Sequence, residues 1–298
     1  MDQGFNRRQI LISAGLFFTG MPRLTLTHAS STSEPKFSVR TPLEGNTLRE
    51  RVLFADQVGF DGIEIGGGKW FNPPVDTILQ DLAGTNIKIS AASASQNHLH
   101  IDPIKRAESI EENKQRLIKA QKLGADCLVV VPVFGKNKFQ DISPIMTPRD
   151  IEKRLLVHAL RELAPVAEAT KVTIVIEPLT KKETHFINRQ MQAVEIIRQV
   201  DSSGVRLLTD FYHMQMEEKD IAQTMKQCAE FTAYVHVADG VKRLEPGSLP
   251  FDYRPGFAEL KKIGYSGWIT IESGSSSKNI KHVLKNGLAY LKQQWKEA

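Results

Sequence analysis

The stretch "RDIEKRLLVHALRELAPVAEATKVTIVIE", residues 149–177, decides the fold because it contains one complete helix followed by one strand. In residues 149–170 the apolar side chains recur three and four positions apart, which indicates an amphipathic helix. Residues 172–177 form an apolar run rich in β-branched residues, as expected for a strand that is buried on both faces of a parallel sheet. A helix that leads into such a strand is the repeating unit of an α/β protein.

The same alternation of apolar runs and helical segments continues through the chain from residue 37 onward. It gives eight strand candidates, at residues 37–41, 62–66, 87–92, 127–133, 172–177, 205–210, 233–238 and 268–272. Eight such units close most simply into a (β/α)8 TIM barrel, which we expect as a single domain over residues 37–298. A doubly wound open sheet is the competing fold, but it usually needs fewer strands and a glycine-rich turn after the first of them.

The N-terminus has the pattern of an export signal. The sequence "NRRQILISAGLFFTG", residues 6–20, places two arginines directly before a short apolar segment, which resembles a twin-arginine signal peptide. We expect the signal at residues 1–29, a linker at residues 30–36 and a periplasmic location. A disordered extension or a retained anchor is the alternative. No later stretch of about 20 apolar residues occurs, so no membrane span is expected in the mature form.

Composition is ordinary for a globular protein, with 41% hydrophobic and 24% charged residues, so the chain can bury a large core. The formal net charge is +5, and removal of residues 1–29, which hold three arginines and one aspartate, would leave +3. This excess is too small to indicate binding to nucleic acid.

Four polar side chains stand at the ends of the last four predicted strands, where the active site of such a barrel lies. They are Glu177, Asp210, His236 and Glu272. Each alone could cap a helix or be a satisfied core residue, but isolated charges that converge inside an apolar barrel would be costly to bury. A divalent cation would remove that cost. Three carboxylates and one imidazole favour Mn²⁺, Mg²⁺ or Co²⁺ over a structural zinc site.

Four motifs resemble the sugar phosphate isomerase/epimerase family of xylose isomerase-like barrels, which includes ketose 3-epimerases and hydroxypyruvate isomerases. These motifs are "IEPLTKKETHFIN", "LLTDFYHMQMEEKDI", "YVHVADGVKRLEPG" and "GWITIES". The resemblance implies one divalent metal ion, Mn²⁺ first with Mg²⁺ or Co²⁺ as alternatives, held by the four residues named above. It also implies that Glu177 and Glu272 form the catalytic acid and base pair.

Further substrate contacts are implied by the same resemblance. Glu183 aligns with a carboxylate near the substrate carbonyl, and His213 aligns with a substrate-binding histidine. A basic residue is expected after the seventh strand, where spacing leaves Lys242 and Arg243 open; we favour Arg243 because a planar guanidinium can hold two oxygens at once. Glu64 in "GIEIG" is expected at the same rim, in contact with substrate or in a structural role. Relatives are often dimers or tetramers, so a homo-oligomer is expected.

The leading hypothesis is a metal-dependent isomerase or epimerase that acts on a small keto-sugar or hydroxy-keto acid through an enediolate. A lyase or dehydratase that acts on a keto-sugar or keto-inositol is the second reading. A DNA-repair nuclease would need additional histidines at the strand ends, which this sequence does not offer. A non-catalytic sugar-binding barrel is the last alternative. Because export favours substrates without phosphate, we expect an unphosphorylated sugar and no nucleic-acid or membrane partner.

Overall fold

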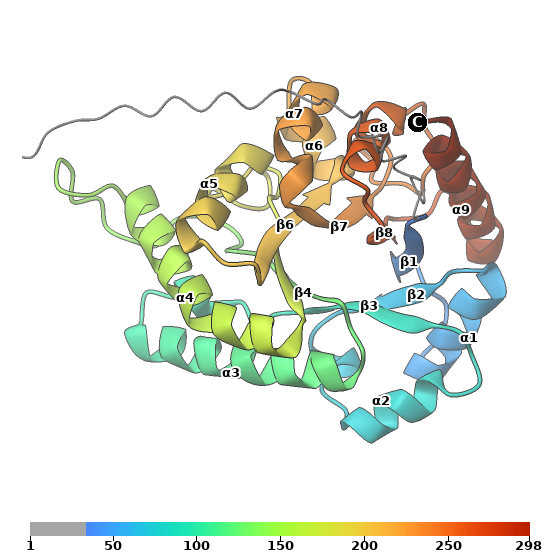
Figure 1. Ribbon diagram of the computed structural model, residues 1–298, viewed down its shortest axis with the longest axis horizontal. Coiled ribbons are helices and arrows are strands. Elements are labelled where there is room, and N and C mark those ends of the chain that lie inside the picture. Colours follow the sequence, from blue (N-terminus) through green and yellow to red (C-terminus); the bar gives the residue numbers. More distant parts are fainter. Residues whose placement is uncertain (1–33) are drawn as a thin grey trace, which may run out of the picture. The chain divides into compact units, whose positions relative to one another are not determined.

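The computed structural model describes residues 34–298, and the predicted signal peptide at residues 1–29 lies outside the described residues. Eight parallel strands close into a barrel in the order of the sequence, as Figure 1 shows. The last strand pairs with the first, so the sheet has no edge. The strands are β1 (Lys36–Thr41), β2 (Gly62–Ile65), β3 (Lys88–Ser93), β4 (Cys127–Val130), β5 (Thr173–Ile176), β6 (Val205–Asp210), β7 (Thr232–Val237) and β8 (Trp268–Glu272). The predicted TIM barrel is therefore confirmed.

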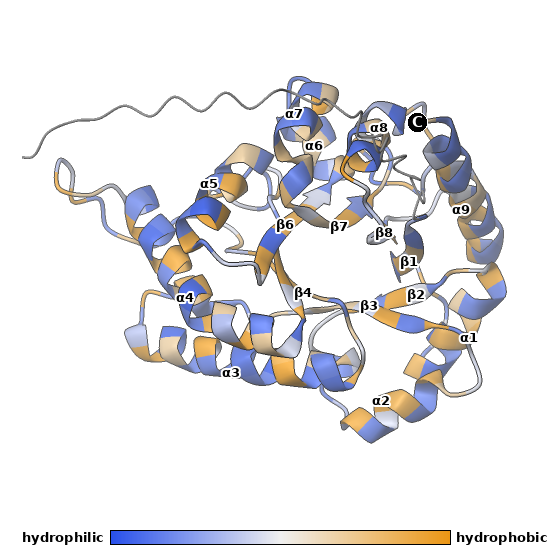
Figure 2. Cartoon of the chain, viewed as in Figure 1, coloured by the Kyte–Doolittle hydropathy of each residue, from blue (hydrophilic) through white to orange (hydrophobic). Residues whose placement is uncertain are grey.

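Helices surround the strands, and apolar residues (orange) alternate with hydrophilic residues (blue) along them in Figure 2. Most of their buried apolar residues belong to the main core cluster. The helices are α1 (Leu48–Val58), α2 (Val75–Leu82), α3 (Pro103–Lys122), α4 (Pro148–Thr170), α5 (Gln190–Val200), α6 (Phe211–Glu217), α7 (Ile221–Cys228), α8 (Arg254–Lys262) and α9 (Ile280–Glu297), with 3₁₀ turns at Gly68–Trp70, Asn97–Leu99 and Ala229–Phe231. Among the described residues, none of these helices is long and apolar enough to cross a bilayer.

Local sequence signals explain why α4 starts and ends where it does. The hydroxyl of Thr147 accepts a hydrogen bond from the Asp150 amide, and the Asp150 carboxylate accepts one from the Thr147 amide. This reciprocal pair satisfies backbone donors that the first helical turn leaves free. Pro148 occupies the first helical position, where its missing N–H costs nothing. Lys171 then ends the helix in the left-handed conformation and turns the chain into β5.

Alternate residues of each strand face the barrel interior, and this alternation builds the floor of the site. Inside the barrel, Trp268 and Tyr234 belong to a small apolar cluster separate from the main core between strands and helices. A layer of hydroxyl groups comes next, because the Tyr234 hydroxyl lies 2.7 Å from the hydroxyls of both Ser90 and Thr270. Two positions beyond Thr270 on β8 comes Glu272. The interior therefore changes from apolar to hydroxyl-bearing to charged toward the carboxyl ends of the strands.

Candidate metal centre and active site

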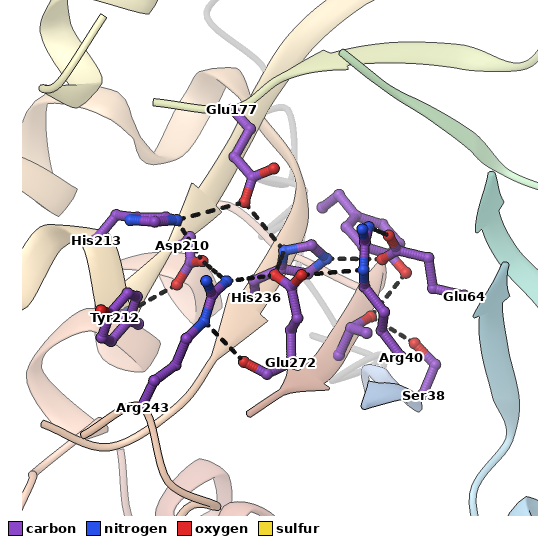
Figure 3. A network of polar contacts seen from close by, with 12 residues as sticks. Ser38, Arg40, Glu64, Glu177, Asp210, Tyr212, His213, His236, Arg243 and Glu272 are labelled. Carbon is purple, nitrogen blue, oxygen red and sulfur yellow. Dashed lines mark hydrogen bonds and ion pairs between the residues drawn. The ribbon is translucent and has the colours of Figure 1, made fainter. Parts of the chain in front are cut away.

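The structure brings the four predicted metal ligands together at the carboxyl end of the barrel (Figure 3). Glu177 follows β5, Asp210 ends β6, His236 lies in β7 and Glu272 ends β8. One donor atom from each of the four lies within 4.8 Å of the others. Only Glu272 is more than marginally accessible, with 15% of its side chain exposed. Four adjacent strands thus deliver one donor each to a single point.

The donors fit a cation because one of the four, an oxygen of Asp210, has no hydrogen-bond partner in the described chain. Asp210 Oδ2 is buried and has no hydrogen-bond partner among residues 34–298, and the same holds for His213 Nε2, which lies 3.4 Å from it. Burial raises the pKa of Asp210, and the positive charges of Arg243 and His236 offset this only in part. A buried carboxylate oxygen without a donor is costly, and a divalent ion bound by these oxygens would remove the cost.

His236 is oriented by a carboxylate on the far side of its ring. Its Nδ1 lies 3.0 Å from Glu272 and 3.3 Å from Glu177, while its Nε2 lies 2.7 Å from Glu64 Oε2. Burial opposes the charged imidazolium of His236, but the carboxylates of Glu64 and Glu272 outweigh this effect and raise the pKa well above its usual value. When Nε2 donates to Glu64, Nδ1 can present its lone pair to a metal ion, as in other carboxylate–histidine–metal arrangements.

Two arginines hold Glu272 from opposite ends of its carboxylate. Arg40 Nε lies 3.0 Å from Oε1, and Arg243 Nη2 lies 2.7 Å from Oε2. Arg40 also forms an ion pair with Glu64, so it connects the two carboxylates on either side of His236. Burial raises the pKa of Glu272, but His236, Arg40 and Arg243 more than reverse this and hold the pKa far below its usual range. Glu272 is therefore ionised at neutral pH.

The mouth of the site carries the predicted substrate contacts. The Arg243 guanidinium stacks on Tyr212 at 4.6 Å and lies 3.9 Å from Glu183, whose side chain is 33% exposed. His213 lies beneath them, with Nδ1 accepting from the Thr180 amide at 3.1 Å. Burial lowers the pKa of His213, against the opposing effect of Glu177.

Of the two basic candidates after β7, Arg243 points into the site and Lys242 is exposed. The loop that places Arg243 is built around the buried carboxylate of Asp239. Its oxygens accept hydrogen bonds from the Gly247 and Leu249 amides and from the Tyr253 hydroxyl. Asp239 also exchanges two backbone hydrogen bonds with Leu244, which closes the turn. This closure fixes the backbone directly beside Arg243.

Arg40 was not among the residues predicted from the sequence. The signal is nevertheless present in "FSVRT", because Arg40 is two residues beyond the inward-facing Ser38 and is the one charged residue near the end of a buried strand. The structure places Glu64 with its side chain fully buried behind His236. A direct contact of Glu64 with substrate stays a prediction.

Comparisons with known proteins agree with the fold and identify the family. The family model described as "Xylose isomerase-like TIM barrel" matches residues 52–294. The chain is 26% identical to 3-dehydro-D-guloside 4-epimerase of Escherichia coli over 82% of this chain and 94% of that one. It is 32% identical to a probable ketose 3-epimerase of Synechocystis sp., over 82% and 85% of the two chains. The crystal structure of 3-keto-D-glucoside 4-epimerase from E. coli superposes with a TM-score of 0.77 at 24% identity, over 87% of this chain and all of that one.

Proposed function

We propose that this chain, which belongs to the xylose isomerase-like TIM barrel family, is a divalent-metal-dependent sugar isomerase or epimerase that transfers a proton through an enediolate of its substrate. The observation that carries the proposal is the pair of glutamates in one donor cluster. Glu177 and Glu272 enter from strands β5 and β8 and both reach Nδ1 of His236. A keto-sugar bound between them would have a carboxylate on each side of the carbon next to its carbonyl.

The residues divide the chemistry among them. A bound divalent ion supplies a Lewis acid that stabilises negative charge on the substrate oxygens. One glutamate of the pair removes the proton next to the carbonyl, and a glutamate returns a proton to the neighbouring carbon or to the opposite face. Arg243 and His213 bind substrate oxygens. Glu183 lies 3.9 Å from the Arg243 guanidinium, so it can reach the same part of the substrate. Tyr212 supports the guanidinium of Arg243 by stacking.

The test is the exchange of substrate hydrogen with solvent deuterium, in a screen of unphosphorylated keto-sugars with Mn²⁺ present. We expect Glu177→Gln and Glu272→Gln each to lower the exchange rate by at least about 100-fold, because proton transfer by a positioned side chain contributes about 10²–10⁴-fold. The matched control is Glu259→Gln, on the outer helix α8. Exchange at the wild-type rate in both active-site variants would contradict the proposal.

Product mass separates the proposed reaction from elimination on the same barrel. Isomerisation and epimerisation conserve the mass of the sugar, whereas a lyase or dehydratase product is lighter by the group that leaves. A lighter product together with full deuterium exchange would assign the same proton abstraction to a lyase.

We propose Mn²⁺ as the ion, an unphosphorylated sugar as the substrate and twin-arginine export to the periplasm. The oxygen-rich donor set supports Mn²⁺. The paired arginines Arg7 and Arg8 before an apolar segment support twin-arginine export. Phosphorylated sugars are scarce outside the cytoplasm, so a periplasmic location supports an unphosphorylated substrate.

A further inference from the structure

A pocket of about 190 Å³ opens beside the metal centre, between the ends of β1 and β2 and the first turn of α1. Two of its lining residues, Arg40 and Glu64, belong to the network that contacts Glu272 and His236. The pocket therefore adjoins the metal centre, and the ion pairs of Arg40 with Glu64 and Glu272 connect the two. The nearby Trp70 and Leu43 supply apolar wall.

Arg51 is the unusual member of the lining. Its Nε donates to the Gly45 carbonyl at 3.1 Å, and its guanidinium stacks on Trp70 at 4.3 Å. Its two terminal nitrogens make no hydrogen bond, and no carboxylate lies within 4.0 Å of it, among residues 34–298. Burial lowers the pKa of Arg51, with no acidic neighbour to oppose that effect. The two terminal nitrogens can thus donate to a ligand.

The charges of the pocket leave this guanidinium without a counterion in the part of the chain that the structure describes. Glu64 is the acidic residue of the lining, and it is already held by Arg40 and His236. Lys69 adds a second positive charge beside Trp70, at 4.4 Å from the ring. A planar guanidinium with two free terminal nitrogens in a partly buried pocket matches a carboxylate, whose two oxygens can accept one N–H from each nitrogen in parallel.

We propose that this pocket binds the end of the substrate remote from the reacting carbon, and that Arg51 recognises a carboxylate there, so that the substrate is a keto-sugar acid. This inference rests on the proposed function, because the metal centre fixes which end of the sugar reacts. The carbon chain would lie along Trp70 and Leu43. A phosphate could also accept from both terminal nitrogens of Arg51, but its second negative charge would need further donors, and within the described residues Arg51 is the one cation of the lining that is not already paired with a carboxylate.

The test measures binding of three probes that carry no carbonyl and so cannot react. They are a hexitol, the hexonate with a carboxylate in place of one terminal CH₂OH, and the hexitol phosphate, each titrated calorimetrically into metal-loaded protein. We expect the hexonate to bind more tightly than the hexitol by roughly 10- to 100-fold, the range for hydrogen bonds to charged groups. Arg51→Gln should abolish the preference. Arg51→Lys should keep part of it, since the charge stays but the two parallel N–H groups are lost.

Arg154→Gln is the control, because Arg154 is exposed on α4 and its loss changes the net charge equally. Metal content and hexitol binding show whether each variant is folded. A hexonate preference that persists in Arg51→Gln, no preference in the wild type, or tighter binding of the phosphate would each overturn the inference. Because the probes do not react, a failure of deuterium exchange with the preference intact would contradict only the proposed function.

Discussion

Glu64 illustrates how a residue outside the ligand set can control the centre. Its carboxylate is completely buried, and it contacts His236 on one side and Arg40 on the other. A carboxylate in this position fixes which nitrogen of the imidazole carries the proton and makes the other nitrogen a stronger ligand. The structure therefore assigns Glu64 a positioning role through His236, whatever contact it also makes with substrate.

Replacing Glu64 should weaken metal binding without removing a ligand. We expect Glu64→Gln to raise the dissociation constant for Mn²⁺ by roughly 10-fold and Glu64→Ala by roughly 100-fold, because an amide can still accept the Nε2–H of His236 but carries no charge. Calorimetric titration of metal into the apo protein measures both constants. Glu183→Gln is the control, since Glu183 contacts Thr180 and Arg243 at the mouth. Wild-type affinity in both Glu64 variants would refute the positioning role.

For single residues, the sequence predicted which side chains come together at the site, but not which partner each side chain contacts. A polar residue at the end of a buried strand is a local signal, and it identified Glu177, Asp210 and Glu272. Whether Glu64 faces substrate or His236 depends on the relation of β2 to β7 across the barrel, which no local pattern contains. The same reason hid the bridge that Arg40 makes between two carboxylates.

Among the elements, β2 and β8 meet at a contact that only glycine permits. A Cβ added at Gly62 would lie 2.7 Å from the Lys88 carbonyl oxygen and 2.8 Å from the Trp268 ring. Trp268 fills the barrel beneath the site and is 1% exposed, so it has no room to move. The close approach of these elements holds Glu64 and Glu272 at their positions, two and four residues further along.

We expect Gly62→Ala to destabilise the fold by about 1–3 kcal/mol, the usual cost of overpacking a core. Gly66→Ala is a matched control in the same segment, because a Cβ there meets nothing within 4 Å. Urea unfolding of the two variants measures the difference. Equal stability of the two variants would show that the Trp268 contact does not restrict the barrel.

Element existence was predictable, and element ends were less so. All eight strands were identified because buried parallel strands are continuous apolar runs. The fourth was expected to reach residue 133 but ends at Val130, because the apolar run continues after pairing to β5 stops at Ile176. The signal peptide at residues 1–29 stays a prediction.

For the whole molecule, the charges around the centre are unbalanced without a cation. Four carboxylates, those of Glu64, Glu177, Asp210 and Glu272, face two guanidiniums, those of Arg40 and Arg243. With His236 neutral, as a metal ligand must be, these six groups carry two negative charges, which one divalent ion would balance. Without an ion, the raised pKa of His236 favours a proton on the imidazole, so an ion would take the place of that proton. Such an ion would also join β5, β6, β7 and β8 at one point, so its loss should loosen half of the barrel.

Metal stoichiometry tests this account most directly. Mass spectrometry of the elements would be applied to protein that has been chelated, reloaded with Mn²⁺ and freed of excess ion, with thermal unfolding recorded alongside. We predict about one equivalent in the wild type and in Asp76→Asn, an exposed control on α2, and almost none in Asp210→Asn. The melting temperature should fall on chelation in the first two proteins only. The account would be contradicted if the wild-type protein retained no divalent ion, and if added metal changed neither its melting temperature nor its exchange of substrate hydrogen with solvent.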